Sequence, residues 1–273
     1  MKILICIAGL PYAEPTLRFG RLVAETLGGE VTVLTVMAAN GDRERARETL
    51  DRVREMLAGL AIDTLVRTGS PSEEILRECE EGAYDLVVIG AKDKPSLAEF
   101  VLGSVAVQVL THARCSVLVV KGDRASLSKI LVCTEGKAYA EPAIEMGSQI
   151  AEAAGARVTL LHVTAPVPAM YTGLEEIEEG LVEFLQANTP QANHLKRGAE
   201  ILEFHGVEGE LKLQHGVPEE EIQREAQKGD FDLIVLGSSR ARGPLVSYFW
   251  GDVARSVVNR VKHPVLVVRP KNS

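Results

Sequence analysis

The chain has 273 residues, of which 46% are hydrophobic and 4% aromatic, and its formal net charge at pH 7 is −8. This length is enough for two domains with separate cores. The negative charge and the few aromatic side chains argue against a nucleic-acid-binding surface. No apolar run approaches the length that crosses a bilayer, so we expect no membrane insertion.

The first half of the chain alternates short apolar runs with amphipathic segments. Alternation at this spacing predicts a parallel sheet with helices on both faces. The glycines Gly28 and Gly29 end the first predicted helix. Strands are predicted at residues 3–7, 30–36, 64–68, 86–89 and 117–120, and helices from residue 15 onward, at 43–60, within 69–81 and from residue 103 onward.

The second half repeats the first. The letters YAEP stand at residues 12–15 and again at 139–142, and GSPSEEI at 69–75 returns as GVPEEEI at 216–222. Internal identity of this kind indicates two copies of one unit. We therefore divide the chain into domains at residues 1–122 and 129–273.

The second copy is longer in its middle. A helical insertion is predicted around residues 166–190, with apolar residues at helical spacing over 174–187. An amphipathic helix must cover an apolar surface. We expect it to pack on its own domain rather than on a partner.

The four cysteines, Cys6, Cys79, Cys115 and Cys133, show no CxxC spacing. Cys6 and Cys133 occupy equivalent places inside predicted buried strands, where a thiol behaves as a small apolar group. This pattern is typical of a reduced compartment, and we expect a cytoplasmic protein.

A strand, a glycine turn and a Gly-led helix follow one another in each copy. In the first copy they are the strand before Gly90 and the helix that begins at Gly103 and Ser104. The free N–H groups and the positive dipole end of such a helix favour an anion, so the layout is typical of a phosphate site. The alternative is that both glycines only allow tight packing.

With these motifs, both halves resemble the universal stress protein domain over nearly the whole chain, as in tandem members of that family. The resemblance implies two doubly wound, five-stranded parallel α/β domains of the adenine nucleotide alpha hydrolase-like type. Domains of this family commonly dimerise through their last strand. We therefore predict that the strands at 117–120 and 265–268 pair antiparallel and join the units as an internal pseudo-dimer.

The ATP-binding members share a signature of Gly, two residues, Gly, nine residues, Gly and then Ser or Thr. In the first unit Gly90, Gly103 and Ser104 stand at this spacing, whereas Asp93 replaces the middle glycine. The resemblance therefore implies a usable phosphate site in the first unit.

The second unit departs from the signature at its phosphate end. Gly237 and Gly251 are one residue further apart, Arg240 or Gly243 lies near the middle position, and Asp252 replaces the serine. An Asp that caps its own helix would take the place of the anion. We therefore expect ATP to prefer the first unit.

An acid that serves the adenosine part commonly follows the first strand in this family. Ala8 stands there in the first unit and Glu135 in the second. Tyr12 and Glu14 recur as Tyr139 and Glu141, either because they line the rim of each pocket or because both helices start alike. The candidate nucleotide-binding residues of both units are Ile7, Ala8, Val36, Gly90, Asp93, Gly103, Ser104, Val105, Thr134, Glu135, Val163, Gly237, Arg240 and Gly251.

Three functional classes stay open. The resemblance favours a stress-response regulatory protein that binds ATP, ADP or AMP, with Mg²⁺ accompanying ATP. The second class has the same fold but acts through protein contacts, alone or as a homodimer, with pockets that are empty or hold another ligand. The third is a weak adenine-nucleotide hydrolase. The chain has no GxxxxGK[ST], GxSxG or HExxH motif, so we expect a binding protein rather than an enzyme, with no catalytic or metal-ligating residues to name.

Overall fold

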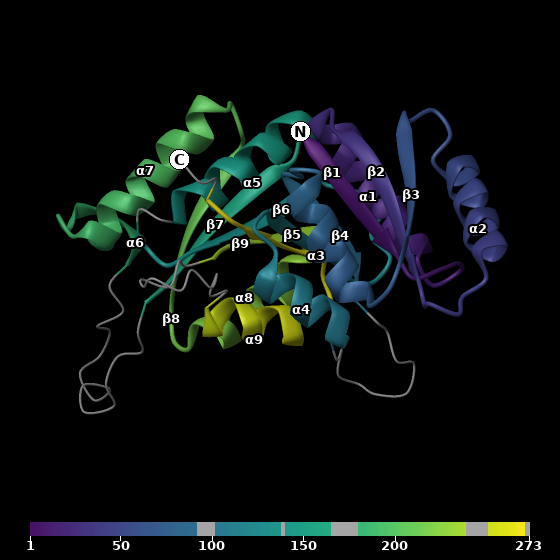
Figure 1. The fold of residues 1–273 in the computed structure, drawn as a ribbon. Coiled ribbons are helices and arrows are strands. Elements are labelled where there is room, and N and C mark those ends of the chain that lie inside the picture. Colours follow the sequence, from purple (N-terminus) through teal and green to yellow (C-terminus); the bar gives the residue numbers. More distant parts are fainter. Residues whose placement is uncertain (92–101, 138–139, 165–179, 239–250, 271–273) are drawn as a thin grey trace.

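The computed structural model describes residues 1–91, 102–137, 140–164, 180–238 and 251–270. Ten strands form one sheet in the order β3-β2-β1-β4-β5-β10-β9-β6-β7-β8, with helices on both faces (Figure 1). Neighbouring strands are parallel except β5 and β10, where the two halves of the chain meet. The predicted architecture, two repeated α/β units with parallel strands, is therefore present.

The first unit contains five strands and four helices among the described residues. In chain order they are β1 (Lys2–Ile7), α1 (Glu14–Leu27), β2 (Glu30–Met37), α2 (Arg43–Met56), β3 (Ile62–Thr68), α3 (Pro71–Glu81), β4 (Leu86–Gly90), α4 (Ser104–His112) and β5 (Ser116–Val120).

The second unit repeats this order and has one further helix, α6, among its described residues. Its elements are β6 (Lys129–Thr134), α5 (Glu141–Ala154), β7 (Arg157–Thr164), α6 (Leu181–Gln186), α7 (Pro190–Phe204), β8 (Gly209–His215), α8 (Pro218–Gly229), β9 (Leu233–Gly237), α9 (Asp252–Arg260) and β10 (Val265–Val268).

The first helices of the two units end in the same way. Gly28 after α1 has φ 57° and Gly155 after α5 has φ 63°, a left-handed conformation that glycine adopts without steric cost. Pro15 and Pro142 lie in the first turns, where the missing N–H costs no helical bond. The predicted stop at Gly28 is confirmed. The second helix, predicted at 43–60, is shorter and ends at Met56.

Alternate strand residues divide the core between the two faces of the sheet. Along β1, Ile3, Ile5 and Ile7 pack on the face covered by α1, α2, α5 and α7. Leu4 and Cys6 pack on the opposite face, beneath α3, α4, α8 and α9. A strand between two helix layers has no solvent-facing side, which is why the strands read as nearly continuous apolar runs.

The insertion helix packs on its own unit. Within the described part of the predicted 174–187 helix, α6 buries Phe184 against Ala192 and Leu195 of α7, with Leu213 of β8 beside them. Residues 165–179 lie outside the described residues. Phe184 also lies 5.7 Å from the His162 ring, measured between ring centroids. The described part of the insertion therefore extends the core of the second unit.

The two units meet through their last strands. β5 and β10 pair antiparallel, with Leu118 opposite Leu266. Lys121, just after β5, donates to the carbonyls of Val258 and Val261 at the end of α9, the second at 3.0 Å. A pseudo-two-fold relation between the units stays a prediction.

A cationic residue at the equivalent position of the second unit contacts the first unit in the same way. Arg269, just after β10, donates to the Leu110 carbonyl in α4 of the first unit. Lys121 and Arg269 are 1% and 4% exposed. Each buried cation thus satisfies carbonyl groups at the C-terminal end of a helix in the other unit, where positive charge is favoured.

Candidate functional site

The strand order places a topological switch point in each unit. β1 lies between β2 and β4, with β3 beyond β2 on one side and β5 beyond β4 on the other, so the strand order reverses at β1. In the second unit β6 lies in the same way between β7 and β9. In open parallel sheets ligands bind at such a switch point, outside the carboxyl ends of the strands. The candidate site of each unit is therefore at this edge.

The candidate residues of the first unit gather there. Ile7 is the last residue of β1 and is buried, and Ala8 follows it at the surface. Val36 lies near the end of β2, and Gly90 is the last residue of β4. These four residues reach the edge at which the helix α4 begins.

The start of α4 supplies the predicted anion-binding end. Gly103 is its N-cap and makes no side-chain capping bond, and Ser104 is its first, solvent-exposed residue. Val105 is half-buried and packs on the core beneath α3 and α4. The first amides of α4 therefore have no capping side chain, which suits an anion. Asp93 lies outside the described residues.

Gly90 also has a packing role. A Cβ atom at this position would lie 2.5 Å from Oγ1 of Thr16, a buried residue in the first turn of α1. At the equivalent Gly237 the nearest atom, Cα of Ala140, would be at 3.6 Å, an ordinary contact. The tight-packing explanation, which was offered for Gly90 and Gly103, is therefore supported at Gly90, whereas the equivalent Gly237 has room for a Cβ atom.

The corresponding edge of the second unit has a cavity of about 430 Å³. A volume of this order falls within the range of small-molecule sites. It is lined by residues from β6, β7, β9, α8 and α9 and from the loop after β6. Four of the predicted residues, Thr134, Glu135, Val163 and Gly237, are among them. Gly251 lies just before α9, and Arg240 lies outside the described residues.

Charge in this cavity is mostly acidic. Glu135 pairs with Lys137 at 3.8 Å, and both side chains line the cavity. Asp252 lines it as well, and within the described part of the chain its carboxylate accepts no hydrogen bond. The lining therefore has two carboxylates and one ammonium group.

The expectation that Asp252 caps its own helix is wrong. The N-cap of α9 is Gly251, with φ 58°, and Asp252 is the first residue inside the helix. The N-cap is the position whose side chain accepts hydrogen bonds from the amides two or three residues later. Asp252 is therefore not the cap of α9, and it is one of the residues that line the cavity.

A buried polar network beneath the cavity was not predicted. His194 Nε2 lies 2.6 Å from Thr134 Oγ1, and His162 Nδ1 donates to the Thr134 carbonyl at 2.9 Å. Burial lowers the pKa of both histidines below the usual 6.5. In the first unit Thr35 Oγ1 donates to the equivalent Ile7 carbonyl at 3.3 Å. Aligning the repeat would have placed His162 at this position.

The repeated loop motif separates into two parts. Glu14 and Glu141 are the first residues of α1 and α5, where a carboxylate is favoured by the helix dipole. A shared helix start therefore accounts for both glutamates. Tyr12 is 92% exposed, and Tyr139 lies outside the described residues.

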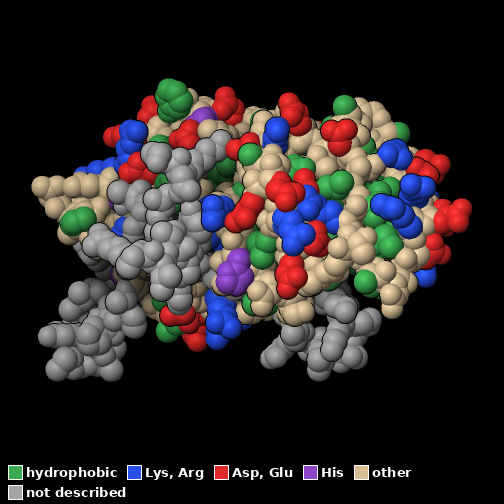
Figure 2. All heavy atoms as spheres, viewed as in Figure 1, with side chains coloured by type: hydrophobic (Ala, Val, Ile, Leu, Met, Phe, Trp, Pro, Cys, Tyr) green, Lys and Arg blue, Asp and Glu red, His purple; other side chains and the backbone are tan. Residues whose placement is uncertain are grey.

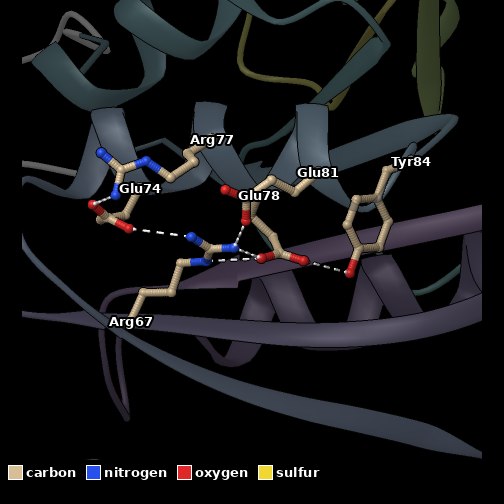
Figure 3. A network of polar contacts seen from close by, with 6 residues as sticks. All are labelled: Arg67, Glu74, Arg77, Glu78, Glu81 and Tyr84. Carbon is tan, nitrogen blue, oxygen red and sulfur yellow. Dashed lines mark hydrogen bonds and ion pairs between the residues drawn. The ribbon is translucent and has the colours of Figure 1, made fainter.

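A second polar cluster lies between β3 and α3, away from the switch point (Figure 3). Arg67 Nε donates to Glu78 at 2.7 Å, and the same guanidinium contacts Glu74 at 3.4 Å and Glu81. The Tyr84 hydroxyl donates to Glu78 at 3.1 Å. The cluster ties an edge strand to its covering helix.

Acidic and basic side chains alternate on the face seen in Figure 2, with apolar groups scattered among them. Among the described residues no helix is long and apolar enough to span a membrane, and no cluster of His, Cys, Asp and Glu has the makings of a metal site.

Comparison with known proteins identifies the family. The model of the universal stress protein family matches residues 1–121 and again 127–269. The chain belongs to the universal stress protein family. The two matches show that it is a tandem member, as the internal repeat predicted.

Individual relatives agree with this. A universal stress protein of Methanocaldococcus jannaschii is 40% identical over 81 residues, which cover 29% of this chain and 48% of that protein. One of Mycolicibacterium smegmatis is 26% identical over 243 residues, 84% of this chain and 78% of that protein. The crystal structure of a universal stress protein from Archaeoglobus fulgidus has the same fold, with a TM-score of 0.75 and 20% identity over 98% of both chains.

Proposed function

We propose that this universal stress protein is a regulatory protein that binds an adenine nucleotide, with the phosphates at the start of α4 in the first unit. The difference between Ser104 and Asp252 carries the proposal. Both are the first residues of helices that begin at a switch point. One offers a neutral hydroxyl and the other a carboxylate to the same part of the ligand.

The chemistry of the α4 start fits a phosphate. The helix has nine residues, and Gly103 leaves its first amides uncapped. A phosphate there gains hydrogen bonds from these amides and the favourable end of the helix dipole. Ala8, beyond β1, supplies no acid for the adenosine part, so we expect binding to depend on the phosphate end.

The second unit has a negatively charged side chain, Asp252, where the first unit has the neutral Ser104. A carboxylate about 4 Å from a phosphate oxygen costs roughly 4 kcal/mol per charge pair at an effective dielectric constant near 20. The cavity lined by Asp252 is therefore expected to bind a triphosphate poorly. The proposed role is binding without catalysis, and Mg²⁺ would enter only as part of Mg-ATP.

Two measurements on the full chain test this function. Mass spectrometry of small molecules released from freshly purified protein should detect an adenine nucleotide. Calorimetric titration with ATP, ADP and AMP, with and without Mg²⁺, should show one site per chain. Heats equal to buffer dilution for all three nucleotides, together with no released nucleotide, would refute the proposal and leave the protein-contact alternative.

A further inference from the structure

The repeat divides the cysteines of this chain into two kinds. Cys79 and Cys115 have no cysteine counterpart in the second unit, where Ala226 and His263 occupy the equivalent positions. The fold therefore does not require a thiol at either place. The two cysteines without counterparts are also the two that lie together.

Two neighbouring segments hold them in contact. Cys79 lies in α3, and Cys115 lies between α4 and β5. The adjacent residues Glu80 and Arg114 form an ion pair at 3.3 Å. Both cysteines belong to the same apolar cluster, and the Cys79 thiol hydrogen-bonds to the Cys115 sulfur. The structure thus has a reduced thiol pair at this point.

The two thiols differ in reactivity. The hydrogen bond from Cys79 lowers the pKa of Cys115 against the opposing effect of burial, and the positive charge of Arg269 also lowers it. The same hydrogen bond, with burial, raises the pKa of Cys79. Cys115 is partly exposed whereas Cys79 is buried. A thiol with a lowered pKa and access to solvent, beside a second thiol, is the arrangement of redox-sensitive cysteines.

The other two cysteines supply an internal reference. Cys6 and Cys133 occupy equivalent positions in β1 and β6, and both are 7% exposed. Burial raises the pKa of each thiol. Such thiols are inert toward oxidants at neutral pH.

We propose that Cys115 and Cys79 form a peroxide-sensitive pair that closes an intramolecular disulfide. The Cys115 thiolate attacks hydrogen peroxide, the O–O bond breaks, and the sulfur is oxidised to a sulfenic acid as hydroxide leaves. The Cys79 sulfur then attacks this sulfur, the S–O bond breaks, and the proton of Cys79 leaves with the oxygen as water. Two thiols and one peroxide thus give one disulfide and two waters.

The disulfide would act on two features of the molecule. The segment between the two cysteines contains Gly90, Gly103 and Ser104, so the new loop encloses the predicted phosphate end. Arg269, from the second unit, has its backbone N–H bonded to Ser116 Oγ at 3.2 Å, next to Cys115. The oxidised state therefore changes the surroundings of both the first site and the junction between the units.

The experiment follows the four thiols in the full chain. Protein treated with a slight excess of hydrogen peroxide is alkylated, digested with trypsin without reduction, and measured by mass spectrometry. Cleavage after Arg77, Lys92, Arg114 and Lys121 puts Cys79 in peptide 78–92 and Cys115 in peptide 115–121. We expect these two peptides to be joined, and titration after unfolding to find two thiols where there were four.

Two variants fix the order of events. Cys79→Ala copies the second unit, and should leave a sulfenic acid on Cys115 that a dimedone probe traps. Cys115→Ser should abolish the reaction and lower peroxide consumption at least about tenfold, because the buried thiols that remain lack thiolate character.

Three results would overturn the proposal. The first is oxidation of Cys6 or Cys133 at the same rate as Cys115. The second is a disulfide between chains on a non-reducing gel with no joined 78–92 and 115–121 peptides, and the third is unchanged peroxide consumption by Cys115→Ser. Far-UV circular dichroism of both variants shows whether they are folded. If Cys115→Ser is not, the cross-linked peptide and the dimedone adduct of Cys79→Ala decide the question.

Discussion

At the scale of single residues, the two units differ most at the first position of their fourth helix. Ser104 in α4 and Asp252 in α9 are equivalent, and each begins a helix whose N-cap is a glycine. The two N-cap glycines differ in φ, at −64° and 58°, so each side-chain exchange is compared with a control variant in the same unit.

We expect Ser104→Asp to weaken ATP binding at least about tenfold, which needs only about 1.4 kcal/mol of repulsion. Ser104→Asn is the matched control, since it has the shape of Asp without the charge and should bind within a few fold of wild type. Calorimetry on both variants makes the comparison. Equal affinity of Asp and Asn variants would remove the charge argument.

The opposite substitution, from a carboxylate to a hydroxyl, can be made at Asp252 in the second unit. In a chain that already has Ser104→Asp, Asp252→Ser should create ATP binding at the second cavity. The substitution removes the carboxylate of a residue that lines this cavity, and with it the repulsion of the phosphates. Titration should then show a new site that Asp252→Glu does not produce. Strong ATP binding at this cavity before the change would show that Asp252 does not oppose the phosphates.

At the scale of secondary-structure elements, polar side chains fasten outer helices to their neighbours. The second unit repeats Glu74 and Glu78 as Glu221 and Glu225, yet its cation comes from a different place on the strand. There Lys212 of β8 donates to Glu225 at 2.6 Å, where the first unit uses Arg67 of β3. The buried carboxylates persist, and the position of their cation varies.

Arg67→Met should destabilise the chain by about 3 kcal/mol, because it removes the cation that pairs with the buried Glu78, whereas Glu74 keeps Arg77 at 2.8 Å. Urea unfolding at neutral pH measures the loss. Arg54→Met is the control, since Arg54 pairs with Asp51 on the surface and its loss should cost less than about 1 kcal/mol. Similar losses in both variants would mean that the Arg67 cluster contributes no more than a surface pair.

His205 should make the packing of α7 on α5 depend on pH. Its ring contacts Glu152 at 2.6 Å and Glu145 at 2.9 Å, and these contacts raise the pKa of His205 above 6.5. A raised folded-state pKa gives stability that is fully present below pH 6.5 and is lost as pH rises through the folded pKa.

The measurement compares wild type with His205→Gln by urea unfolding from pH 5.5 to 8.5. The stability difference should be largest at the acid end and shrink with rising pH. Using the difference removes the opposite effect of His162, His194 and His263, whose pKa values burial lowers. A difference that grows with pH would contradict the sign of the shift.

At the scale of the whole molecule, the continuity of the sheet depends on the junction of β5 and β10. Three residue pairs join these strands, from Val117–Val267 to Val119–Val265. Lys121 and Arg269 add reciprocal contacts to α9 and α4. The junction buries two positive charges, and their hydrogen bonds to carbonyl groups offset part of the cost of that burial.

Lys121→Met should therefore lower stability by about 2 kcal/mol, the scale of a buried hydrogen bond to a charged group, and loosen the coupling between the units. Calorimetry should show a lower Tm and a broader or divided transition. Lys228→Met, a change at an exposed lysine in the last turn of α8, is the control and should leave the transition unchanged. A single sharp transition at the wild-type Tm would show that Lys121 does not hold the junction.

The sequence by itself determined the class of the fold, the two units and the family. Apolar periodicity reports strands buried on both faces, and identity such as YAEP at 12–15 and 139–142 reports a repeat, because both depend on local residue order. The stop at Gly28 follows equally from local chemistry, since only a residue tolerant of left-handed φ ends a helix in that way.

Only the tertiary structure decided where side chains without a local signature point and what they meet. Asp252 was expected to cap α9 and instead lies one position inside it, because Gly251 is the N-cap, as Gly103 is in α4. The contacts of Lys121 with α9, of His194 with Thr134 and of Cys79 with Cys115 join positions far apart in the chain. Such contacts depend on how the sheet and helices pack, and residue order alone does not specify them.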